Sequence, residues 1–567
     1  MMRCRKEART MAIRIPVGKE NFDEIRKSGL YYVDKTELIY DLVGGTDNEV
    51  TLFTRPRRFG KTLNMSMMES FFDIKRDSRS VFEGLDITKH ESFCEEWMNQ
   101  YPVLFISFKD VDGLSFDSAY AKLAVVIADY CKKIVLLGKD DRADADDRII
   151  FSRLKAQQAT DADIQNSLKT IMRMMHAVYG KPVILLIDEY DVPLAKASEK
   201  NSAQNRYYEQ MLDVIKGMLS IALKTNEYLK FAVITGCLRI AKESIFTGTN
   251  NFISYSVLDE DFSQYFGFTT KEVADLLKAA DCLDKADIIR EWYDGYAFGN
   301  SQVYCPWDVV SYVSALVRRV DAEPKNYWRN TSSNTILRDF VSHNDDWGIP
   351  DKFESIMNGG TVTVTISDEL TYDSLHDSEQ NLWSILLMTG YLTKADPKVR
   401  DSRVPLRIPN REIEGIFADT VAKLFADTLD NSRQKELMAA FWNEDVEEAT
   451  KRLSDFLWDT ISYMDYHEDY YHAFLAGLFV GLGYAVDCNK ESGLGRFDVF
   501  VKDRRNRRAM LIEAKKSESQ ESMSADCDEA LKQIEDKGYA RSLEPGYEKF
   551  VKYGVSFFRK SAMIKKL

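Results

Sequence analysis

The chain has 567 residues, too many for a single hydrophobic core, and this length predicts two to four domains. Its composition, 45% hydrophobic and 29% charged residues, is typical of a soluble globular protein. A net charge of -14 argues against a chain that coats nucleic acid nonspecifically along its whole length, but it leaves room for a local basic groove.

Cysteine usage and hydropathy favour a cytoplasmic protein. The eight cysteines are scattered and no two form a Cys-x-x-Cys pair, so we expect neither a disulfide framework nor a structural zinc site. The N-terminus carries charges but no apolar segment of the kind found in signal peptides. No apolar run approaches the twenty residues that cross a bilayer, so we expect no membrane partner.

Short apolar runs alternate with helical-looking stretches through the first half of the chain. Near-continuous hydrophobicity is typical of strands covered on both faces, and alternation with helices indicates a parallel α/β sheet. We therefore predict an α/β domain over residues 11–265. Its expected strands are 50–54, 102–108, 183–188 and 231–235, and its expected helices are 64–74, 118–137, 161–179 and 205–225.

The rest of the chain divides into a middle and a C-terminal region. From about Thr269 the pattern is aromatic-rich and mostly helical, which predicts a helical middle region over 266–455 with one strand at 361–366. The last hundred residues predict a compact α/β module over 456–567. Its expected elements are a helix at 465–482, strands at 484–488, 496–502 and 509–515, and a helix at 526–536.

The first expected strand is followed by a loop, Arg-Pro-Arg-Arg-Phe-Gly-Lys-Thr at 55–62, that has the features of a P-loop. A P-loop holds phosphate because backbone N–H groups at a helix N-terminus converge on the oxygens, a lysine adds charge, and a Ser/Thr hydroxyl binds Mg²⁺. Arg55 stands where the motif has its first glycine, and a surface turn before a helix is the alternative. The candidate nucleotide-binding residues of the loop are Arg57, Arg58, Phe59, Gly60, Lys61 and Thr62.

The third expected strand ends in the acidic pair Asp188-Glu189. In a P-loop ATPase Asp188 would bind Mg²⁺ directly or through water, and Glu189 would act as general base on the attacking water. An acidic pair that merely ends a strand in solvent is the alternative. We expect this pair and Lys61 to lie at the carboxyl ends of neighbouring strands, in one crevice that binds ATP and Mg²⁺.

Two further candidates follow the fourth expected strand. Thr235 would position the hydrolytic water, and Arg239, like Arg57 and Arg58, would stabilise charge on the phosphates. A surface or interdomain ion pair explains each arginine equally well. Arginines that act on a neighbouring subunit would require a homo-oligomer or a partner protein.

The first 300 residues or so resemble the bacterial AAA-ATPase-like family. In that family the arginine-rich loop is the usual form. The resemblance implies ATP binding and hydrolysis, with Lys61, Thr62, Asp188 and Glu189 in the matching positions, and it places Tyr32, Asp34 and Lys35 over the nucleotide. The segments that carry it are 31–35, 55–62, 187–191, 235–246 and the pair Asn250-Asn251.

The C-terminal module contains a separate acidic group. Asp498 lies in one expected strand, and Glu513 and Lys515 lie two residues apart in the next, so that the last two share a face. Two carboxylates on adjacent strands suit a hard divalent cation, and a lysine beside them stabilises charge on phosphorus. The pattern indicates metal-dependent phosphodiester hydrolysis, with an edge-strand salt bridge as the alternative.

Residues 465–540 resemble the PD-(D/E)XK nuclease superfamily, in the form often fused behind AAA-ATPase-like domains. This resemblance implies a restriction-endonuclease-like fold, adds Glu468 as a helix-borne metal ligand and adds Gln533 as a supporting residue. Some members keep the fold without the activity. The basic run 502–508 would contact a phosphate backbone or form a solvated hairpin tip.

The leading hypothesis is an ATPase coupled to a metal-dependent nuclease-like domain that acts on DNA. Nucleotide state would then alter how the middle region presents the C-terminal module. One alternative is a nucleotide-switched signalling or scaffold NTPase whose nuclease-like domain only binds. A third hypothesis is an assembly protein with two degenerate sites.

Overall fold

The structure is a computed structural model, and its described residues fall into two compact units. One unit comprises the described residues up to 328 together with those of 363–412, and the other comprises those of 332–362 and 413–567. The described ranges are 13–45, 48–198, 207–240, 252–328, 337, 349–357, 359–367, 370, 372, 377–399, 401, 403–417, 420, 431–460, 471, 474–475, 478–479, 484–492, 495–543 and 546–567.

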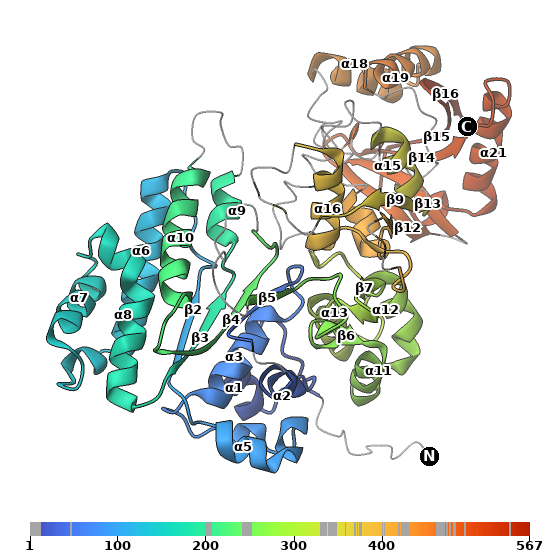
Figure 1. The fold of residues 1–567 in the computed structure, drawn as a ribbon. Helices are drawn as coiled ribbons and strands as arrows, with labels where there is room; N and C mark the ends of the chain where they lie inside the picture. The colour runs from blue at the N-terminus through green and yellow to red at the C-terminus, as the bar shows by residue number, and fades with distance from the viewer. Residues whose placement is uncertain are drawn as a thin grey trace, which may run out of the picture. The chain divides into compact units, whose positions relative to one another are not determined.

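A five-stranded parallel sheet in the order β2-β3-β4-β1-β5 lies at the centre of the first unit (Figure 1). The four predicted strands are confirmed, and β5 is an additional edge strand. The prediction that the strands before Lys61 and Asp188 are neighbours is wrong, because β4 lies between β1 and β3. Hydrophobic runs mark strands, whereas strand order depends on how the crossovers pack. The strands are β1 (Val50–Thr54), β2 (Val103–Ser107), β3 (Val183–Asp188), β4 (Leu229–Gly236) and β5 (Phe252–Tyr255).

Helices cover both faces of this sheet, as the continuous hydrophobicity of its strands requires (Figure 1). The longest helix, α8, begins at a Thr160–Asp163 capping box and ends at Gly180 in the left-handed conformation. On one face lie α1 (Phe22–Lys27), α2 (Glu37–Gly44), α3 (Lys61–Phe72), α4 (Arg79–Phe82) and α5 (Glu91–Trp97). The others of this region are α6 (Phe116–Lys133), α7 (Ala145–Ala156), α8 (Asp161–Tyr179), α9 (Val192–Ser198) and α10 (Tyr208–Leu223).

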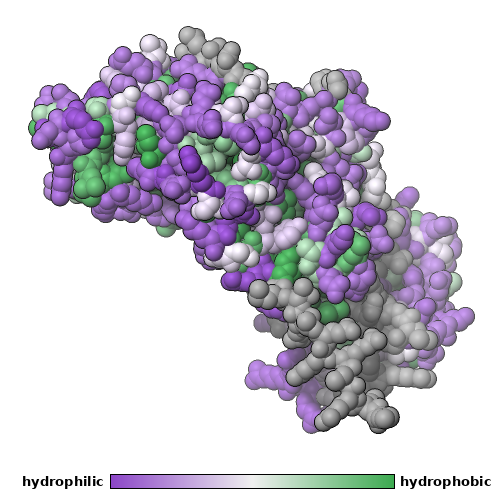
Figure 2. Space-filling model, turned by 90° about the horizontal axis from the view of Figure 1, so that it is seen from below, coloured by the Kyte–Doolittle hydropathy of each residue, from purple (hydrophilic) through white to green (hydrophobic). Residues whose placement is uncertain are grey.

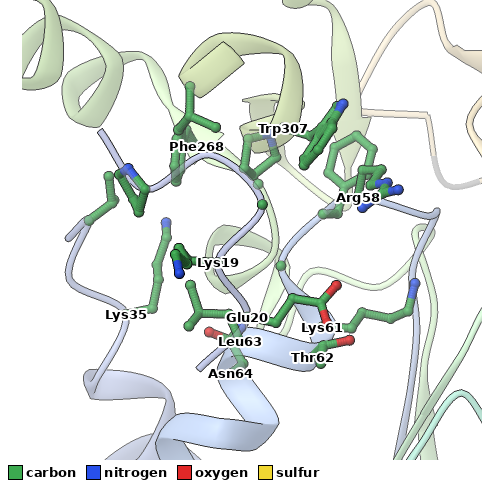
Figure 3. Close-up of a pocket in the computed structure, with 18 of the residues that line it drawn as sticks. Lys19, Glu20, Lys35, Arg58, Lys61, Thr62, Leu63, Asn64, Phe268 and Trp307 are labelled. Carbon is green, nitrogen blue, oxygen red and sulfur yellow. The ribbon is translucent and has the colours of Figure 1, made fainter. Parts of the chain in front are cut away.

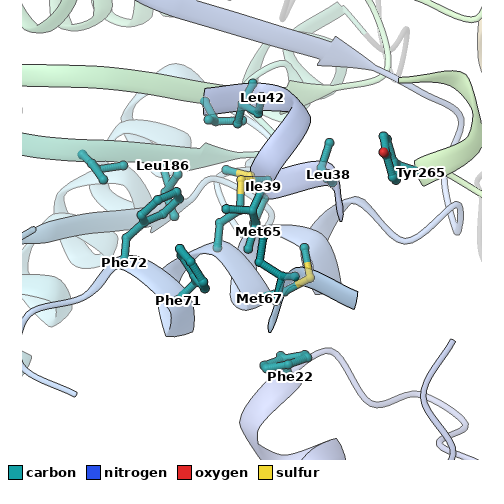
Figure 4. Packing of buried hydrophobic residues seen from close by; sticks show 14 of the residues in the cluster. Phe22, Leu38, Ile39, Leu42, Met65, Met67, Phe71, Phe72, Leu186 and Tyr265 are labelled. Carbon is teal, nitrogen blue, oxygen red and sulfur yellow. The ribbon is translucent and has the colours of Figure 1, made fainter. Parts of the chain in front are cut away.

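A buried hydrophobic cluster fixes α3, the helix that follows the candidate P-loop. Figure 4 shows Met65, Phe71 and Phe72 of α3 in one cluster with Ile39 of α2 and Leu186 of β3, and each of these side chains is fully buried. Burial of a side chain of this size stabilises the fold by about 1.5–3 kcal/mol. The N-terminus of α3 is therefore held in place by the core beneath it.

The region after the large sheet contains more strands than the sequence predicted. A three-stranded sheet of order β6-β8-β7 accompanies α11 (Thr270–Ala279), α12 (Ala286–Tyr293) and α13 (Pro306–Arg318). A second small sheet of order β10-β11-β9 includes the predicted strand, as β9, and α16 (Glu379–Thr389) follows β9 in the chain. Strands of two to five residues are too short to show a period. They are β6 (Phe268–Thr269), β7 (Tyr296–Phe298), β8 (Ser301–Tyr304), β9 (Val362–Thr365), β10 (Thr393–Lys394) and β11 (Arg403–Arg407).

The second unit contains a mixed five-stranded sheet of order β12-β13-β14-β15-β16. The three predicted strands and the helix after them are present, while β15 and β16 were not predicted. The predicted helix at 465–482 lies mostly outside the described residues. The elements are α15 (Ile349–Met357), α18 (Asn431–Asn443), α19 (Val446–Thr460), β12 (Ala485–Ser492), β13 (Gly495–Asp503), β14 (Arg508–Lys516), α21 (Met523–Asp536), α22 (Ala540–Leu543), β15 (Lys549–Phe558) and β16 (Ser561–Lys566).

Among the described residues, no helix is both long and apolar enough to cross a bilayer. The face in Figure 2 is mostly hydrophilic, and its hydrophobic residues are scattered in small separate patches.

Candidate functional site

A cavity of about 370 Å³ lies over the N-terminus of α3, entirely within the first unit (Figure 3). The candidate P-loop, the segment that precedes α1, the residues that follow β2 and β3, and the start of α13 line it. The cavity is strongly cationic, although the chain as a whole has a net charge of -14. Its charged lining residues are Lys19, Lys35, Arg57, Arg58, Lys61, Lys109 and Lys196, with Glu20 and Glu189.

The lysine of the P-loop donates hydrogen bonds to carbonyl groups of the same loop. Gly60 has a φ of 86°, and a Cβ added there would meet no atom within 4 Å, so the left-handed backbone rather than lack of space favours glycine. Lys61 opens α3, and its Nζ donates hydrogen bonds to the carbonyl oxygens of Arg55 and Pro56, both at 2.9 Å. The loop thus presents a helix N-terminus and a lysine to the same space.

Arg58 is held by an aromatic partner. Its φ of 71° is unusual for a residue with a side chain, and its guanidinium lies 4.3 Å from the centre of the Trp307 ring. Phe59 is buried against the rings of Tyr296 and Phe298. Side chains from β7 and from the start of α13 therefore fix the shape of the loop.

Arg55, which replaces the first glycine of the motif, is a structural residue. Its side chain is fully buried, and its Nη1 donates to the carbonyl oxygens of Thr54 at 2.9 Å and Tyr255 at 2.8 Å. The guanidinium also lies 5.2 Å and 5.6 Å from the ring centres of Phe266 and Phe298. Burial lowers the pKa of Arg55 to about 10. The arginine ties the loop to β5 and to the region after it.

Asp188 accepts hydrogen bonds from hydroxyl groups of β4 and of the P-loop helix. Thr62 Oγ1 donates to its Oδ2 at 2.9 Å, and Thr235 Oγ1 donates to its Oδ1 at 2.6 Å. Burial raises the pKa of Asp188, while these two hydrogen bonds and the charge of Lys61 oppose the rise. β4 is the strand that brings Thr235 to the acid, so the strand between β1 and β3 forms part of the site.

Glu189 follows Asp188 in a left-handed conformation, with a φ of 53°, and lines the cavity. Burial raises the pKa of Glu189, and the neighbouring charge of Asp188 raises it further. A raised pKa makes a carboxylate a stronger base. The two acids of the pair thus occupy different surroundings, one inside a hydroxyl network and one at the cavity wall.

Asp498 and Glu513 meet on adjacent antiparallel strands of the second unit. The backbone N–H of Ala514 donates to Asp498 Oδ2 at 2.8 Å, and that of Asp498 lies 3.4 Å from Glu513 Oε2. Gln533 Nε2 on α21 donates to Glu513 Oε1. Asp498 is 9% exposed and Glu513 is fully buried, so protein groups surround both acids.

Lys515 belongs to the same group. Burial raises the pKa of the nearby Tyr539 hydroxyl, a hydrogen bond with Gln533 lowers it, the charges of Glu513 and Asp498 raise it, and that of Lys515 lowers it. The charges of all three predicted residues therefore act on this one hydroxyl. Tyr539 is a candidate site residue that the sequence analysis missed.

Asp498 and Glu513 provide part of a ligand set for a divalent cation. Oxygen ligands from two acids suit Mg²⁺ or Mn²⁺, which commonly keep several water ligands. Within the part of the chain that the structure describes, no three His, Cys, Asp or Glu side chains come together in a way that could hold a metal ion. Glu468, the predicted third ligand, lies outside the described residues.

Comparison with known protein families matches the two stretches of the chain that hold these sites. Residues 16–246 match the family described as predicted AAA-ATPase, and residues 466–567 match the PD-(D/E)XK nuclease superfamily. The chain joins an AAA-ATPase-like domain to a PD-(D/E)XK nuclease superfamily domain. A protein of Azotobacter chroococcum mcd 1, described as an uncharacterized protein in the vnfD 5′ region, is 25% identical over 573 residues, covering 97% of this chain and 98% of the relative.

Not every predicted residue of the AAA-ATPase-like domain reaches the cavity. Tyr32 and Lys35 line it, and Lys35 forms a 2.6 Å ion pair with Glu272. Asp34 instead accepts hydrogen bonds from the backbone of Thr36 and Asp86 and fixes the local chain. Thr235 contacts Asp188 rather than the cavity itself, and Arg239 is not among the lining residues.

Arginines of the basic hairpin in the nuclease-superfamily domain already form contacts within that domain. Arg508 pairs with Asp503 at 2.8 Å and lies 4.3 Å from the Trp442 ring, and Arg507 pairs with Glu548 at 2.7 Å. Arg504 and Arg505 form the exposed tip between β13 and β14. These contacts hold Arg507 and Arg508 in place, while Arg504 and Arg505 are exposed to solvent.

Proposed function

We propose that the AAA-ATPase-like domain binds ATP with Mg²⁺ in the cavity and hydrolyses it, and that the nuclease domain cuts DNA in a metal-dependent reaction. One observation carries the first part. The hydrogen bond from Thr62 to Asp188 joins the P-loop helix to the acid that ends β3, beside a cavity with a large excess of cations. A triphosphate carries the complementary charge.

The chain's own groups fit the phosphates and the metal. Bound Mg²⁺ supplies further neutralisation of phosphate charge, and Thr62 and Asp188 are the residues that would hold it. Lys61 now donates to two carbonyl oxygens of its own loop, and phosphate oxygens would replace those acceptors. The N–H groups at the start of α3 bind the phosphates in the same place.

Glu189 supplies the base for hydrolysis. It takes a proton from water as the water oxygen attacks the terminal phosphorus, and the bond from that phosphorus to the bridging oxygen breaks. ADP and inorganic phosphate leave, and the proton returns to solvent. Arg57 and Arg58, which line the same cavity, stabilise charge on the phosphate oxygens.

The remaining part of the cavity suits the base and ribose. Apolar side chains line it, from the segments before α1 and α2, from β6, and from α11 and α13. They are Ile15, Pro16, Val33, Phe268, Leu276, Pro306 and Val310.

Phosphate release from ATP tests this proposal. We expect Mg²⁺-dependent release by the native protein and a loss of about a hundredfold or more in Lys61→Ala and Asp188→Asn. Lys132→Ala is the matched control, because Lys132 forms an exposed pair with Asp129 away from the cavity. Full activity in Lys61→Ala together with a loss in Asp188→Asn would contradict the P-loop assignment.

Two carboxylates, Asp498 and Glu513, beside Lys515 support the nuclease proposal. In such a site a divalent cation supplies Lewis acidity, the two acids hold it, and Lys515 stabilises charge on the phosphate. The test is cleavage of plasmid and single-stranded DNA with Mg²⁺ or Mn²⁺, with and without ATP. Cleavage that is lost in Asp498→Ala and kept in Lys132→Ala supports it, whereas equal cleavage by both variants would overturn it.

A specific observation favours the second candidate function, a nucleotide-switched scaffold with a nuclease-like binding module. Protein donors, Gln533 and the N–H of Ala514, already engage the two acids. In that case the native protein hydrolyses ATP, cuts no DNA in either metal, and binds a partner protein differently in its ATP and ADP forms.

A further inference from the structure

An ion pair at the cavity wall links two segments that no motif marks. Lys109 Nζ lies 3.6 Å from Glu20 Oε2, and both residues line the cavity. Glu20 precedes α1, and Lys109 follows β2. The two segments are almost ninety positions apart in the chain and meet beside the candidate phosphate site.

The sheet brings Lys109 to the side of the site opposite the P-loop. Ser107 is paired with Asp188 in the register of β2 and β3, and the N–H of Phe108 donates to the carbonyl oxygen of Asp188 at 3.0 Å. Lys109 is the next residue, so it leaves the sheet beside Glu189. Lys61 approaches the same cavity from β1, on the far side of β3 and β4.

Glu20 lines the same cavity as Lys61 and Thr62, the candidate phosphate-binding residues (Figure 3). In the nucleotide-free protein Lys109 therefore offsets a negative charge that faces the phosphate site. An incoming triphosphate would meet repulsion from Glu20 and attraction from Lys109.

The pair is weak enough to exchange. Its side chains are 50% and 51% exposed, so solvent and salt screen the attraction between the two charges. A charge-assisted hydrogen bond between an ammonium group and a phosphate inside the cavity is stronger, because less solvent screens it. Exchange of the carboxylate for a phosphate is thus favourable.

We propose that Lys109 recognises the terminal phosphate of ATP, leaving Glu20 when the triphosphate binds and returning to it when only ADP is present. This rests on the proposed ATP binding. Lys109 would then make the cavity distinguish ATP from ADP. Release of Glu20 would also free the segment before α1 to change position with the nucleotide state.

The test measures equilibrium binding of ADP and of a non-hydrolysable ATP analogue, both with Mg²⁺. The variants are Lys109→Ala, Glu20→Gln and the double variant, with Lys132→Ala as control because its lysine is 52% exposed and similarly paired. We expect Lys109→Ala to weaken binding of the analogue about tenfold and that of ADP by less than about threefold. Glu20→Gln should tighten binding of the analogue.

The double variant distinguishes two roles of Lys109: direct contact with the phosphate, and neutralisation of the charge of Glu20. If Lys109 only offsets Glu20, then Glu20→Gln restores the affinity of Lys109→Ala, and the proposal is overturned. If Lys109 contacts phosphate, the double variant still binds the analogue several-fold more weakly than Glu20→Gln alone. Equal losses for ADP and the analogue would also overturn it. A native protein that binds neither nucleotide would instead refute the ATP site itself.

Discussion

The two candidate sites hold a buried carboxylate in different ways. Asp188 stands at the carboxyl end of a parallel strand and accepts hydrogen bonds from the hydroxyls of Thr62, Thr235 and, at 3.4 Å, Ser107. Glu513 stands within β14 and receives its hydrogen bond from the side-chain amide of Gln533. Both acids are fully buried, and in both cases neutral donors orient the acid without cancelling its charge.

The two sites differ more in the number of cationic side chains around the acids than in the hydrogen bonds to the acids. Seven Lys or Arg residues line the cavity beside Asp188, whereas the candidate cation beside Glu513 is Lys515, two residues further along β14. A cavity built at strand ends draws side chains from many loops, which is where functional groups collect in parallel sheets. A site on neighbouring strands depends on the few residues that those strands supply. The first should therefore tolerate the loss of a peripheral cation, and the second should be sensitive to each supporting contact.

Glu189→Gln should produce the largest effect and separate binding from chemistry in the first site. Removal of a general base lowers kcat about 10²–10⁴-fold, while ATP affinity changes little because the shape of the side chain is kept. Since burial raises the pKa of Glu189, the acid limb of the native kcat–pH profile should lie above pH 4.5, with activity falling as the pH decreases through it. An acid limb below that value would contradict the assignment.

Gln533→Ala tests the sensitivity of the second site to one supporting contact. Gln533 donates to Glu513 and interacts with Tyr539, so its loss frees the acid to change orientation. Loss of such a partner typically lowers metal affinity or activity about 10–100-fold. Measurement of the Mn²⁺ dependence of DNA cleavage, or of Mn²⁺ binding if no cleavage occurs, gives the result. Gln302→Ala, which removes an amide bonded to Asp294 in the other unit, is the control.

The local motifs were predictable from the sequence, whereas the strand order and the tertiary contacts that bring them together were not. Lys61 and Asp188 stand in short segments whose strand–loop context is visible in the residue order. The position of β4 between their strands, and with it the contact of Thr235 with Asp188, depends on tertiary packing. Lys109 and Trp307 reach the cavity from distant segments and carry no motif, so only the fold reveals them.

Asp308 and Glu412 in the first unit are a third pair of buried acids. They differ from the pairs at the two candidate sites because each acid interacts with the other. Burial raises the pKa of Glu412 far above its ordinary value, and Asp308 raises it further, so the pair holds a proton at neutral pH. The unfolded chain releases that proton above pH 4.5, and stability is therefore lost as the pH rises. The slope is about 1.4 kcal/mol per pH unit.

Glu412→Gln should remove this slope. The amide keeps the oxygen that accepts from the N–H of Trp328 at 2.8 Å and offers a permanent donor to Asp308 in place of the shared proton. Chemical unfolding at pH 6, 7 and 8 gives the difference in free energy between the native protein and the variant. That difference should shift in favour of the variant with each step in pH, and a constant difference would show that Glu412 is ionised in the folded protein.

The smallest expected effect compares two Trp–Arg contacts of equal distance, one in each unit. Arg58 lies 4.3 Å from the Trp307 ring centre at the P-loop, and Arg508 lies 4.3 Å from that of Trp442 at the basic hairpin. A partly exposed contact of this kind contributes about 0.5–1 kcal/mol. Trp307→Ala should therefore weaken ATP binding about threefold to fivefold, because Arg58 loses the ring that holds its left-handed backbone. Trp442→Ala should leave ATP affinity unchanged. Equal changes in the two variants would mean that the stack stabilises the fold in general and does not shape the phosphate loop.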